Sequence, residues 1–249
     1  MNLEHPEIKP PLCGAEWAVR AETYAALVSE HLSPCTVWLD AGCGWRLLED
    51  DLDPLEDWLV GHCRFIVGMD VSVAAHRNVN SLVRGSIYAL PFADDSIDLV
   101  TCNMVVEHLD DPGKAFAEVA RCLRPSGALI VHTPNLLNYG IFGNAVASRL
   151  IPEKWRLRMI HGTDDRRPED FFPVRYKANT MRSLLGLLHA AGFEVHQQKA
   201  VPQQGPFFRT TRRLERFLMK LTPNSGLLVC AHKSAAQSQS FRISNMNAI

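Results

Sequence analysis

The 249-residue chain lacks several features that would place it in a functional class at once. It contains no run of about 18 apolar residues, so the sequence predicts no membrane-spanning helix. Its first residues, MNLEHPEIKPPLCGAEW, hold no apolar core of signal-peptide length. The formal net charge of −1 gives no global attraction for nucleic acid or for an anionic membrane. These absences predict a cytoplasmic protein whose partner is not a nucleic acid.

Cysteine pairs are also missing. The seven cysteines are scattered along the chain, and no two of them form a CxxC motif. His62-Cys63 is the only adjacent His/Cys pair, and it has no second pair to complete a tetrahedral ligand set, so a structural role is expected. The sequence therefore predicts reduced thiols, no disulfide framework and no metal site.

What is present is a regular alternation of apolar runs and segments with helical periodicity. The expected strands are 36–40, 64–70, 81–84, 98–103, 126–135, 193–201 and 226–233. The expected helices are 15–32, 46–60, 73–79, 112–123, 181–191 and 209–221. Most strands are apolar throughout, which is typical of a parallel sheet with helices on both faces. We therefore expect an α/β fold.

Domain boundaries follow from breaks in this rhythm. We expect an N-terminal helical segment at 1–35 and a main domain at 36–233. Within that domain, residues 136–180 hold aromatics, prolines and many charges, and a connection this long predicts a lid or substrate-binding insert. The last residues, 234–249, are polar and small, and we expect them to be disordered.

Candidate chemical groups follow the expected strands, where parallel α/β sheets bind ligands. They are Asp40–Gly44, Asp70, Ser86–Tyr88, Asn103–His108 and His132–Asn135. Asp98, at the other end of its strand, is expected to stabilise the start of that strand.

The first of these groups belongs to a glycine turn in WLDAGCGWR. Close glycines after a strand let the backbone approach a ligand, and a helix starting near Arg46 would aim its N–H groups there. A dinucleotide fingerprint needs a third glycine, but Leu47 stands in its place, which disfavours pyrophosphate binding. Asp40 and Asp70 lie 30 residues apart, against roughly 20 in a compact unit. A longer or broken first helix around Pro54 is therefore expected.

Four ordered motifs resemble the class I S-adenosylmethionine-dependent methyltransferases, in the subgroup that includes the ubiquinone and menaquinone methylases. They are DAGCG at 40–44, GMD at 68–70, RGSIYALPFADDSIDLV at 84–100 and AFAEVARCLRPSGALIVHTPN at 115–135. The resemblance covers residues 36–135 closely and 180–233 loosely. It implies a Rossmann-like, mostly parallel sheet of seven strands in the order 3-2-1-4-5-7-6, with the last strand antiparallel. It also implies S-adenosylmethionine as cofactor.

The resemblance implies a set of cofactor contacts. They are Asp40, Ala41, Gly42, Cys43, Gly44, Asp70, Val71, Ser86, Ile87, Asn103 and Met104. Asp70 would accept both ribose hydroxyls, with a helix cap as its structural alternative. Asp40 would orient the cofactor's ammonium group. Ser86 stands where the family often has an acid that binds the adenine amino group, so that contact would lack charge.

The acceptor is less well indicated. The N/D-P-P-Y/F element of base N-methylating enzymes is absent after the fourth strand, which argues against nucleic acid bases. Glu107-His108 resembles the family's EH pair, and His108 is the candidate general base. The alternative is that His108 only orients the cofactor. Methyl transfer from a sulfonium does not require a general base, because positioning alone can accelerate it.

Two later segments bear on the acceptor. The insert places His161, Arg175 and Tyr176 near aromatic residues, which suits a phosphate, carboxylate or sugar; a lid closed by an Asp170–Arg175 pair is the alternative. The helix 209–221 has an apolar stripe and a basic remainder. That stripe is expected to dock on the domain, with peripheral membrane contact as its alternative.

These observations predict a methyltransferase that uses S-adenosylmethionine and acts on an oxygen or carbon nucleophile of a small molecule, such as a sugar, lipid or natural-product intermediate. A protein that binds the cofactor without transferring methyl groups, acting through partners, is the alternative. An NAD-dependent dehydrogenase is disfavoured by Leu47. The sequence leaves the acceptor and the oligomeric state open.

Overall fold

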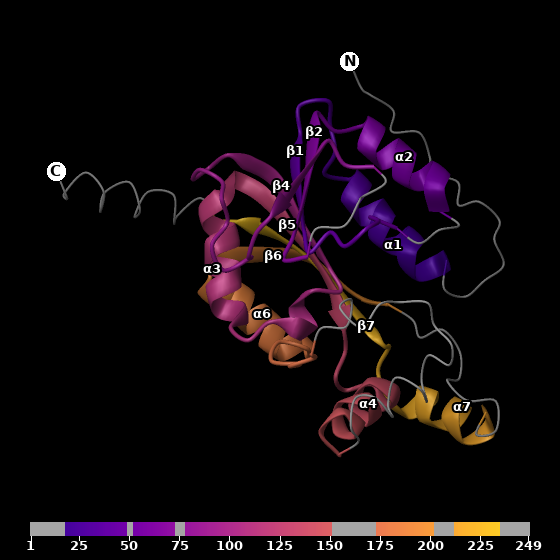
Figure 1. The fold of residues 1–249 in the computed structure, drawn as a ribbon. Helices are drawn as coiled ribbons and strands as arrows, with labels where there is room; N and C mark the ends of the chain where they lie inside the picture. The colour runs from indigo at the N-terminus through magenta and orange to yellow at the C-terminus, as the bar shows by residue number, and fades with distance from the viewer. Residues whose placement is uncertain (1–17, 49–51, 73–77, 151–172, 202–211, 235–249) are drawn as a thin grey trace.

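A computed structural model describes residues 18–48, 52–72, 78–150, 173–201 and 212–234. Seven strands form one sheet in the order β3-β2-β1-β4-β5-β7-β6 (Figure 1), as the resemblance implied. The strands are β1 (Val37–Ala41), β2 (Phe65–Asp70), β3 (Ser81–Arg84), β4 (Ile97–Asn103), β5 (Leu123–Pro134), β6 (Phe193–Val201) and β7 (Gly226–Lys233). Strands β1 to β5 are parallel, and β7 runs antiparallel to both β5 and β6. The expected α/β fold is confirmed.

Helices cover both faces of the sheet (Figure 1). They are α1 (Ala18–Ser29), α2 (Asp53–Gly61), α3 (Pro112–Cys122), α4 (Tyr139–Leu150), α6 (Met181–Ala190) and α7 (Arg212–Leu221). One core packs Trp38 and Leu99 against the α1 and α2 side, and the other packs Leu39 and Val100 against the α3 and α6 side. Neighbouring residues of each central strand are therefore buried on opposite faces, which explains why these strands lack polar alternation.

The strand β4 begins as the sequence indicated. Asp98 Oδ2 accepts a hydrogen bond of 2.8 Å from the backbone N–H of Val37, and Arg124 pairs with the same carboxylate. Asp98 thus joins the start of β4 to the start of β1, away from the ligand-binding edge, and its expected structural role is confirmed.

The segment after the glycine turn differs from expectation. No helix begins at Arg46: residues 45–48 form a turn, and α2 starts only at Asp53, with Pro54 in its first turn. Proline is favoured in the first turn of a helix because the N–H that it lacks is not needed there and its φ is already helical. The glycine turn therefore does not lead directly into a helix N-terminus. The expected helix 73–79 lies mostly outside the described residues, and residues 78–79 are not helical.

The predicted insert is described in part. Its first portion forms α4, residues 151–172 lie outside the described residues, and residues 173–180 return to the domain. Leu136 N donates to Asn179 O at 2.7 Å, which closes the two ends of the insert onto each other. The expected tail and most of the N-terminal segment also lie outside the described residues.

The described helices include none long and apolar enough to cross a membrane. The apolar stripe of α7 does not dock as expected: Leu214, Phe217 and Leu221 are 58%, 56% and 65% exposed. That prediction is wrong for these three side chains. The segment after α7 is joined to the residue before α4, where Pro223 O accepts a hydrogen bond of 3.0 Å from Asn138 Nδ2.

Candidate active site

The carboxyl ends of the central strands bring most of the predicted site residues to one edge of the sheet. Asp40 and Ala41 end β1, Asp70 ends β2 and Asn103 ends β4. β1 lies between β2 and β4, and the chain crosses from one side of β1 to the other. This is the switch point at which doubly wound sheets bind their ligands.

The glycine turn follows β1 and is hydrogen-bonded to the end of β2. The backbone N–H groups of Gly42 and Cys43 both donate to Met69 O, at 2.7 and 3.1 Å. Gly42 has φ +79°, and a Cβ there would lie 2.3 Å from a methyl carbon of Val105, so only glycine fits. Gly44 has φ +54° and open space where a Cβ would point. The turn is thus tightly packed at its first glycine and open at its second.

Asp70 accepts a hydrogen bond from the second glycine of this turn. Its Oδ2 accepts from Gly44 N at 3.1 Å, and its Oδ1 accepts from Ser72 N at 3.0 Å. An ionised carboxylate has about four acceptor positions, so each oxygen keeps room for a further donor. The bond to Ser72 has the local form of a cap, but no described helix starts there. Asp70 therefore combines a structural bond with an acceptor surface beside Gly44.

Asp40 lies deeper than expected. It is 4% exposed, its Oδ1 accepts from Thr101 Oγ1 at 2.6 Å, and Thr101 Oγ1 accepts from Trp38 Nε1 at 2.8 Å. Burial raises the pKa of Asp40 to about 7; the Thr101 hydrogen bond opposes that rise and the charge of Asp70 adds to it. Near neutral pH the Asp40 carboxyl is therefore poised between its charged and neutral forms.

The predicted adenine-side residues follow β3. Ser86 Oγ accepts from Tyr88 N at 3.3 Å, and Ile87 is buried. The hydroxyl of Tyr88 accepts from Asp110 N and Asp111 N, which directs that hydroxyl to the start of α3. Val71, after β2, is half exposed. Cys43 is buried, and its thiol lies against Gly68 of β2.

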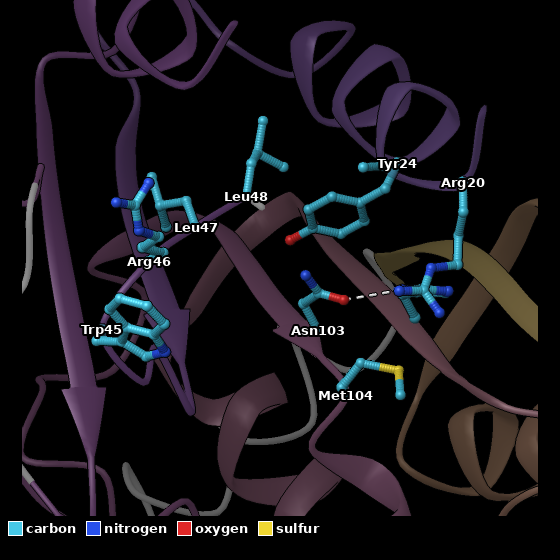
Figure 2. A pocket seen from close by; sticks show the side chains of 10 residues that line it. Arg20, Tyr24, Trp45, Arg46, Leu47, Leu48, Asn103 and Met104 are labelled. Atoms are coloured by element: carbon cyan, nitrogen blue, oxygen red, sulfur yellow. Dashed lines mark hydrogen bonds between the residues drawn. The ribbon is translucent and has the colours of Figure 1, made fainter. Parts of the chain in front are cut away.

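A cavity of about 360 Å³ adjoins the turn (Figure 2). Its wall comes from three parts of the chain: Arg20, Ala21 and Tyr24 on α1, residues 45–48 of the turn, and Asn103, Met104 and His132 at the strand ends. In Figure 2, Arg20 and Tyr24 reach down from α1 toward Asn103 and Met104, and Trp45 and Arg46 lie on the opposite side. The cavity is therefore closed on one side by a helix that precedes the sheet in sequence.

The floor of the cavity is hydrogen-bonded and largely uncharged. His132 Nδ1 donates to Asn103 Oδ1 at 2.8 Å, and Met104 N donates to His132 O at 2.8 Å. Met104 has φ +58°, a left-handed conformation that ordinary side chains rarely adopt and that is common at binding sites. Burial lowers the pKa of His132 to about 3, and the charge of Arg20 adds to the effect. His132 is therefore neutral at physiological pH.

The rim of the cavity is cationic and aromatic. Arg46 pairs with Asp53 at 2.8 Å, and its guanidinium carbon lies 5.2 Å from the centre of the Trp45 ring. Arg46 nevertheless forms part of the cavity wall. Arg20 supplies a second guanidinium from α1. This rim suits an anionic or planar ligand group.

The predicted acceptor-side residues lie apart from this cavity. His108, on the 3₁₀ turn η2 (Val106–His108), has Nδ1 3.2 Å from Pro173 O and is not in the described cavity wall. Arg175 pairs with Asp110 at 2.9 Å, and Tyr176 OH accepts from Asn144 Nδ2 at 3.2 Å. His161 and the alternative partner Asp170 lie outside the described residues.

Glu107 holds the insert in place from inside the domain. Its backbone O accepts from the N–H groups of Arg175 and Tyr176, and its Oε2 accepts from Thr133 Oγ1 at 2.9 Å. Burial raises the pKa of Glu107 to about 7, against the lowering effect of its hydrogen bonds. The EH pair thus consists of a buried anchor and a half-exposed neighbour.

Sequence reasoning missed the α1 contribution. Arg20 and Tyr24 carry no motif, and nothing local shows that their helix crosses the ligand-binding edge. The order of the elements was the one usable signal, because a helix before β1 must cover part of the sheet. His132 was found by its place at a strand end, although its pairing with Asn103 was not.

The comparisons agree with this geometry. Residues 39–131 match the family model for a methyltransferase domain. A demethylmenaquinone methyltransferase of Corynebacterium efficiens is 33% identical over 129 residues, which are 51% of this chain and 55% of the relative. A probable S-adenosylmethionine-dependent methyltransferase of Mycolicibacterium smegmatis is 31% identical over 107 residues, 41% of this chain and 39% of the relative. The chain thus spans only about half, or less, of the length of these curated relatives.

The fold has solved counterparts as well. An S-adenosylmethionine dependent methyltransferase from Mesorhizobium loti superposes with a TM-score of 0.54 at 15% identity, covering 88% of this chain and 100% of that one. At this identity the likeness shows the fold alone. The family model and the sequence relatives support the resemblance of residues 39–131 to the class I S-adenosylmethionine-dependent methyltransferases, and with it S-adenosylmethionine as the cofactor.

Proposed function

We propose that this protein transfers a methyl group from S-adenosylmethionine to an oxygen or carbon nucleophile of a small-molecule acceptor. One observation carries the proposal: at the switch point of the sheet, the Asp70 carboxylate accepts from the backbone of Gly44, which has open space beside it, and the residues directly after Gly44 line the cavity. An acceptor carboxylate, an open backbone turn and an adjoining cavity suit a ligand with a ribose at one end and a reactive group at the other.

The residues present fit the cofactor. Asp70 keeps acceptor capacity for two ribose hydroxyls, and the space beside Gly44 admits a ligand against the backbone. Asp40 is positioned to ionise when a cationic amino group comes near, because its pKa is already close to neutrality. The bound cofactor supplies an electrophilic methyl on a positively charged sulfur that leaves as a neutral thioether. The chain's own contribution is binding, orientation and exclusion of water.

We place acceptor recognition at the cavity rim. Arg20 and Arg46 favour an acceptor that carries a carboxylate, phosphate or other anionic group, and Trp45 offers a face for a planar one. Sugar, lipid and natural-product acceptors all meet this description. Direct contact by Arg175 and Tyr176 stays a prediction, as does any part played by His161.

The general base also stays a prediction. The Pro173 carbonyl can only accept, so His108 Nδ1 carries the proton of that hydrogen bond, and Nε2 lies 3.9 Å from Glu107 Oε1. Such a ring is oriented to take a proton from an acceptor hydroxyl. Its place outside the described cavity wall requires the acceptor to extend toward η2.

The test is transfer of a labelled methyl group from S-adenosylmethionine to fractionated small-molecule extracts, with mass spectrometry of the product. We expect a labelled product from an anionic fraction. Tight binding of S-adenosylhomocysteine in calorimetry without product in any fraction would instead support the cofactor-binding alternative. Thermal stabilisation by NAD but not by S-adenosylhomocysteine would contradict both.

A further inference from the structure

A second polar cluster lies on the face of the sheet covered by α1, away from the candidate active site. Cys230 and His232 are two residues apart on β7, so their side chains share one face of the strand, and His31 follows the end of α1. The potential ligand atoms of His31, Cys230 and His232 all lie within 4.8 Å of one another. In register, Cys230 is opposite Ile130 and His232 opposite Ala128, toward the amino end of β5.

One contact shows that the cluster already has the form of a ligand set. Cys230 Sγ lies 3.2 Å from His31 Nε2. A tetrahedral zinc ion with Zn–S near 2.3 Å and Zn–N near 2.0 Å would hold these atoms about 3.5 Å apart. The pair is therefore within a few tenths of an ångström of the spacing that a shared ion imposes.

The ring of the third residue, His232, is oriented by a hydrogen bond to the backbone. His232 Nδ1 lies 3.1 Å from Ser126 O, and a carbonyl oxygen can only accept, so Nδ1 carries the proton. In the neutral ring, His232 Nε2 is therefore unprotonated, and its lone pair can bind a metal ion. A backbone carbonyl in this position is the usual outer partner of a metal-binding histidine, because it fixes both the tautomer and the ring orientation.

The surroundings suit a cation. Cys230 is 1% exposed, whereas His31 and His232 are half-buried, which leaves an approach from solvent. A bulge in β6 between Val195 and Gln197 places the exposed His196 beside the cluster, with its ring centre 4.3 Å from that of His232. Glu30 adds a carboxylate nearby, held by a 2.7 Å hydrogen bond from Gln197.

We propose that His31, Cys230 and His232 bind a zinc ion, with solvent in the fourth position beside His196. Imidazole and thiolate are the ligands that Zn²⁺ prefers, and a three-residue set with one open position is a regular zinc geometry. On binding, the Cys230 S–H bond breaks, its proton passes to solvent, and a Zn–S bond forms without any change in oxidation state. This proposal does not depend on the proposed methyl transfer.

The site would act as a clip between distant parts of the chain. His31 and Cys230 are 199 residues apart, and His31 closes the helix that carries Arg20 and Tyr24 to the cavity. An ion that binds only the folded chain stabilises it, by an amount that grows with ion concentration. We therefore expect the ion to hold α1 against β7 and to leave the chemistry of the cavity to other residues.

The test uses the full-length, tag-free protein after chelator treatment, titrated with Co²⁺ as a visible substitute for Zn²⁺. We expect about one ion per chain, with absorption bands of a tetrahedral site and a thiolate-to-cobalt charge-transfer band that Zn²⁺ removes. Zn²⁺ at about 100 times its dissociation constant should raise Tm by roughly 5 to 10 °C. Substoichiometric binding without a thiolate band would overturn the proposal.

Variants separate the cluster from other cysteines and histidines. Cys230→Ala and His232→Gln should each weaken Co²⁺ binding at least about tenfold, as loss of a ligand or its support does. Cys63→Ala is the matched control, a half-buried cysteine next to a histidine but outside the cluster. Circular dichroism confirms folding, and His31→Gln replaces any variant that fails to fold. Equal affinity of wild type and the cluster variants, or loss of the band in Cys63→Ala, would refute the site.

Discussion

The candidate active site and the His31–Cys230–His232 cluster are assembled in different ways. In the first, the strand-end groups Asp40, Asp70 and Asn103 come from β1, β2 and β4, within the part of the chain that carries the short motifs. In the second, residues 199 positions apart meet only after α1 has packed beside β7. A site encoded in short motifs is visible in sequence, whereas a site formed by packing has no sequence spacing to reveal it.

This comparison predicts that the two clusters act independently. Variants of the glycine turn should disturb the cofactor site and leave Co²⁺ binding unchanged. Variants of the His31–Cys230–His232 cluster should weaken Co²⁺ binding and leave cofactor binding unchanged. The following predictions test the motif-encoded side of the comparison, from the largest expected effect to the smallest.

Gly42→Ala should cause the largest loss. The added methyl group would lie 2.3 Å from Val105 in a left-handed backbone conformation, so the turn or Val105 must move. We expect the free energy of unfolding in urea to fall by about 3 kcal/mol. Gly44→Ala is the control, because its Cβ meets open space, and it should cost about 1 kcal/mol from backbone strain alone. Equal losses would show that packing under Gly42 is unimportant.

Asp70→Ala should weaken S-adenosylhomocysteine binding about 100-fold, because two charge-assisted hydrogen bonds to the ribose would be lost. Isothermal calorimetry measures the change, and Asp57→Ala on the exposed side of α2 serves as the control. Some weakening through the lost Gly44 contact is part of the expected effect. An affinity within threefold of wild type would remove Asp70 from the cofactor site.

His108→Gln should lower kcat about 100-fold with little change in KM, if the imidazole takes the acceptor proton. The acidic limb of the kcat–pH profile should disappear at the same time, because glutamine does not titrate. His189→Gln, at the end of α6, is a control for a histidine far from η2. An unchanged pH profile would assign His108 to orientation alone.

Asp40→Asn should change how stability depends on pH. The folded-state pKa of Asp40 is raised to about 7 from its ordinary value of 3.8, so the folded chain binds more protons than the unfolded chain between these values. Wild type therefore loses stability from this group as pH rises through that window. The stability of Asp40→Asn relative to wild type should increase by on the order of 2 kcal/mol from pH 4 to 8.

The same carboxyl links pH to cofactor binding. A cationic amino group beside Asp40 favours the carboxylate, so affinity should rise with pH up to about 7 and binding should release protons. Calorimetry in buffers of different ionisation enthalpy detects that release. A proton release that persists in Asp40→Asn would assign it to another group.

The smallest expected effect concerns α7. Its exposed Leu214, Phe217 and Leu221 lie on the same helix as the exposed cations Arg213 and Lys220, which predicts weak binding to anionic vesicles. Phe217→Glu should reduce co-sedimentation with such vesicles about threefold, since it removes apolar area and adds repulsion. Equal sedimentation of variant and wild type would limit α7 to contacts within the protein.

Sequence reasoning was most successful between β1 and β5. There, apolar strands and intervening helices gave the α/β fold, the family resemblance implied the correct strand order, and Asp98 was correctly assigned to the start of β4. It failed at the start of α2, where helical periodicity from Arg46 was overridden by Pro54 and by the turn. It failed again at α7, because an apolar stripe shows what a helix can bury but not whether a surface is within reach.

The sequence by itself determined the fold class and the motif positions at the carboxyl edge, because these depend on residues that are close in the chain, and its resemblance to a known family implied the strand order. Only the tertiary structure decided the burial of Asp40, the roof that Arg20 and Tyr24 form over the cavity, and the meeting of His31 with Cys230. These depend on how α1 packs on the sheet. That packing is set by apolar burial, which is not directional and leaves no fixed spacing in the sequence.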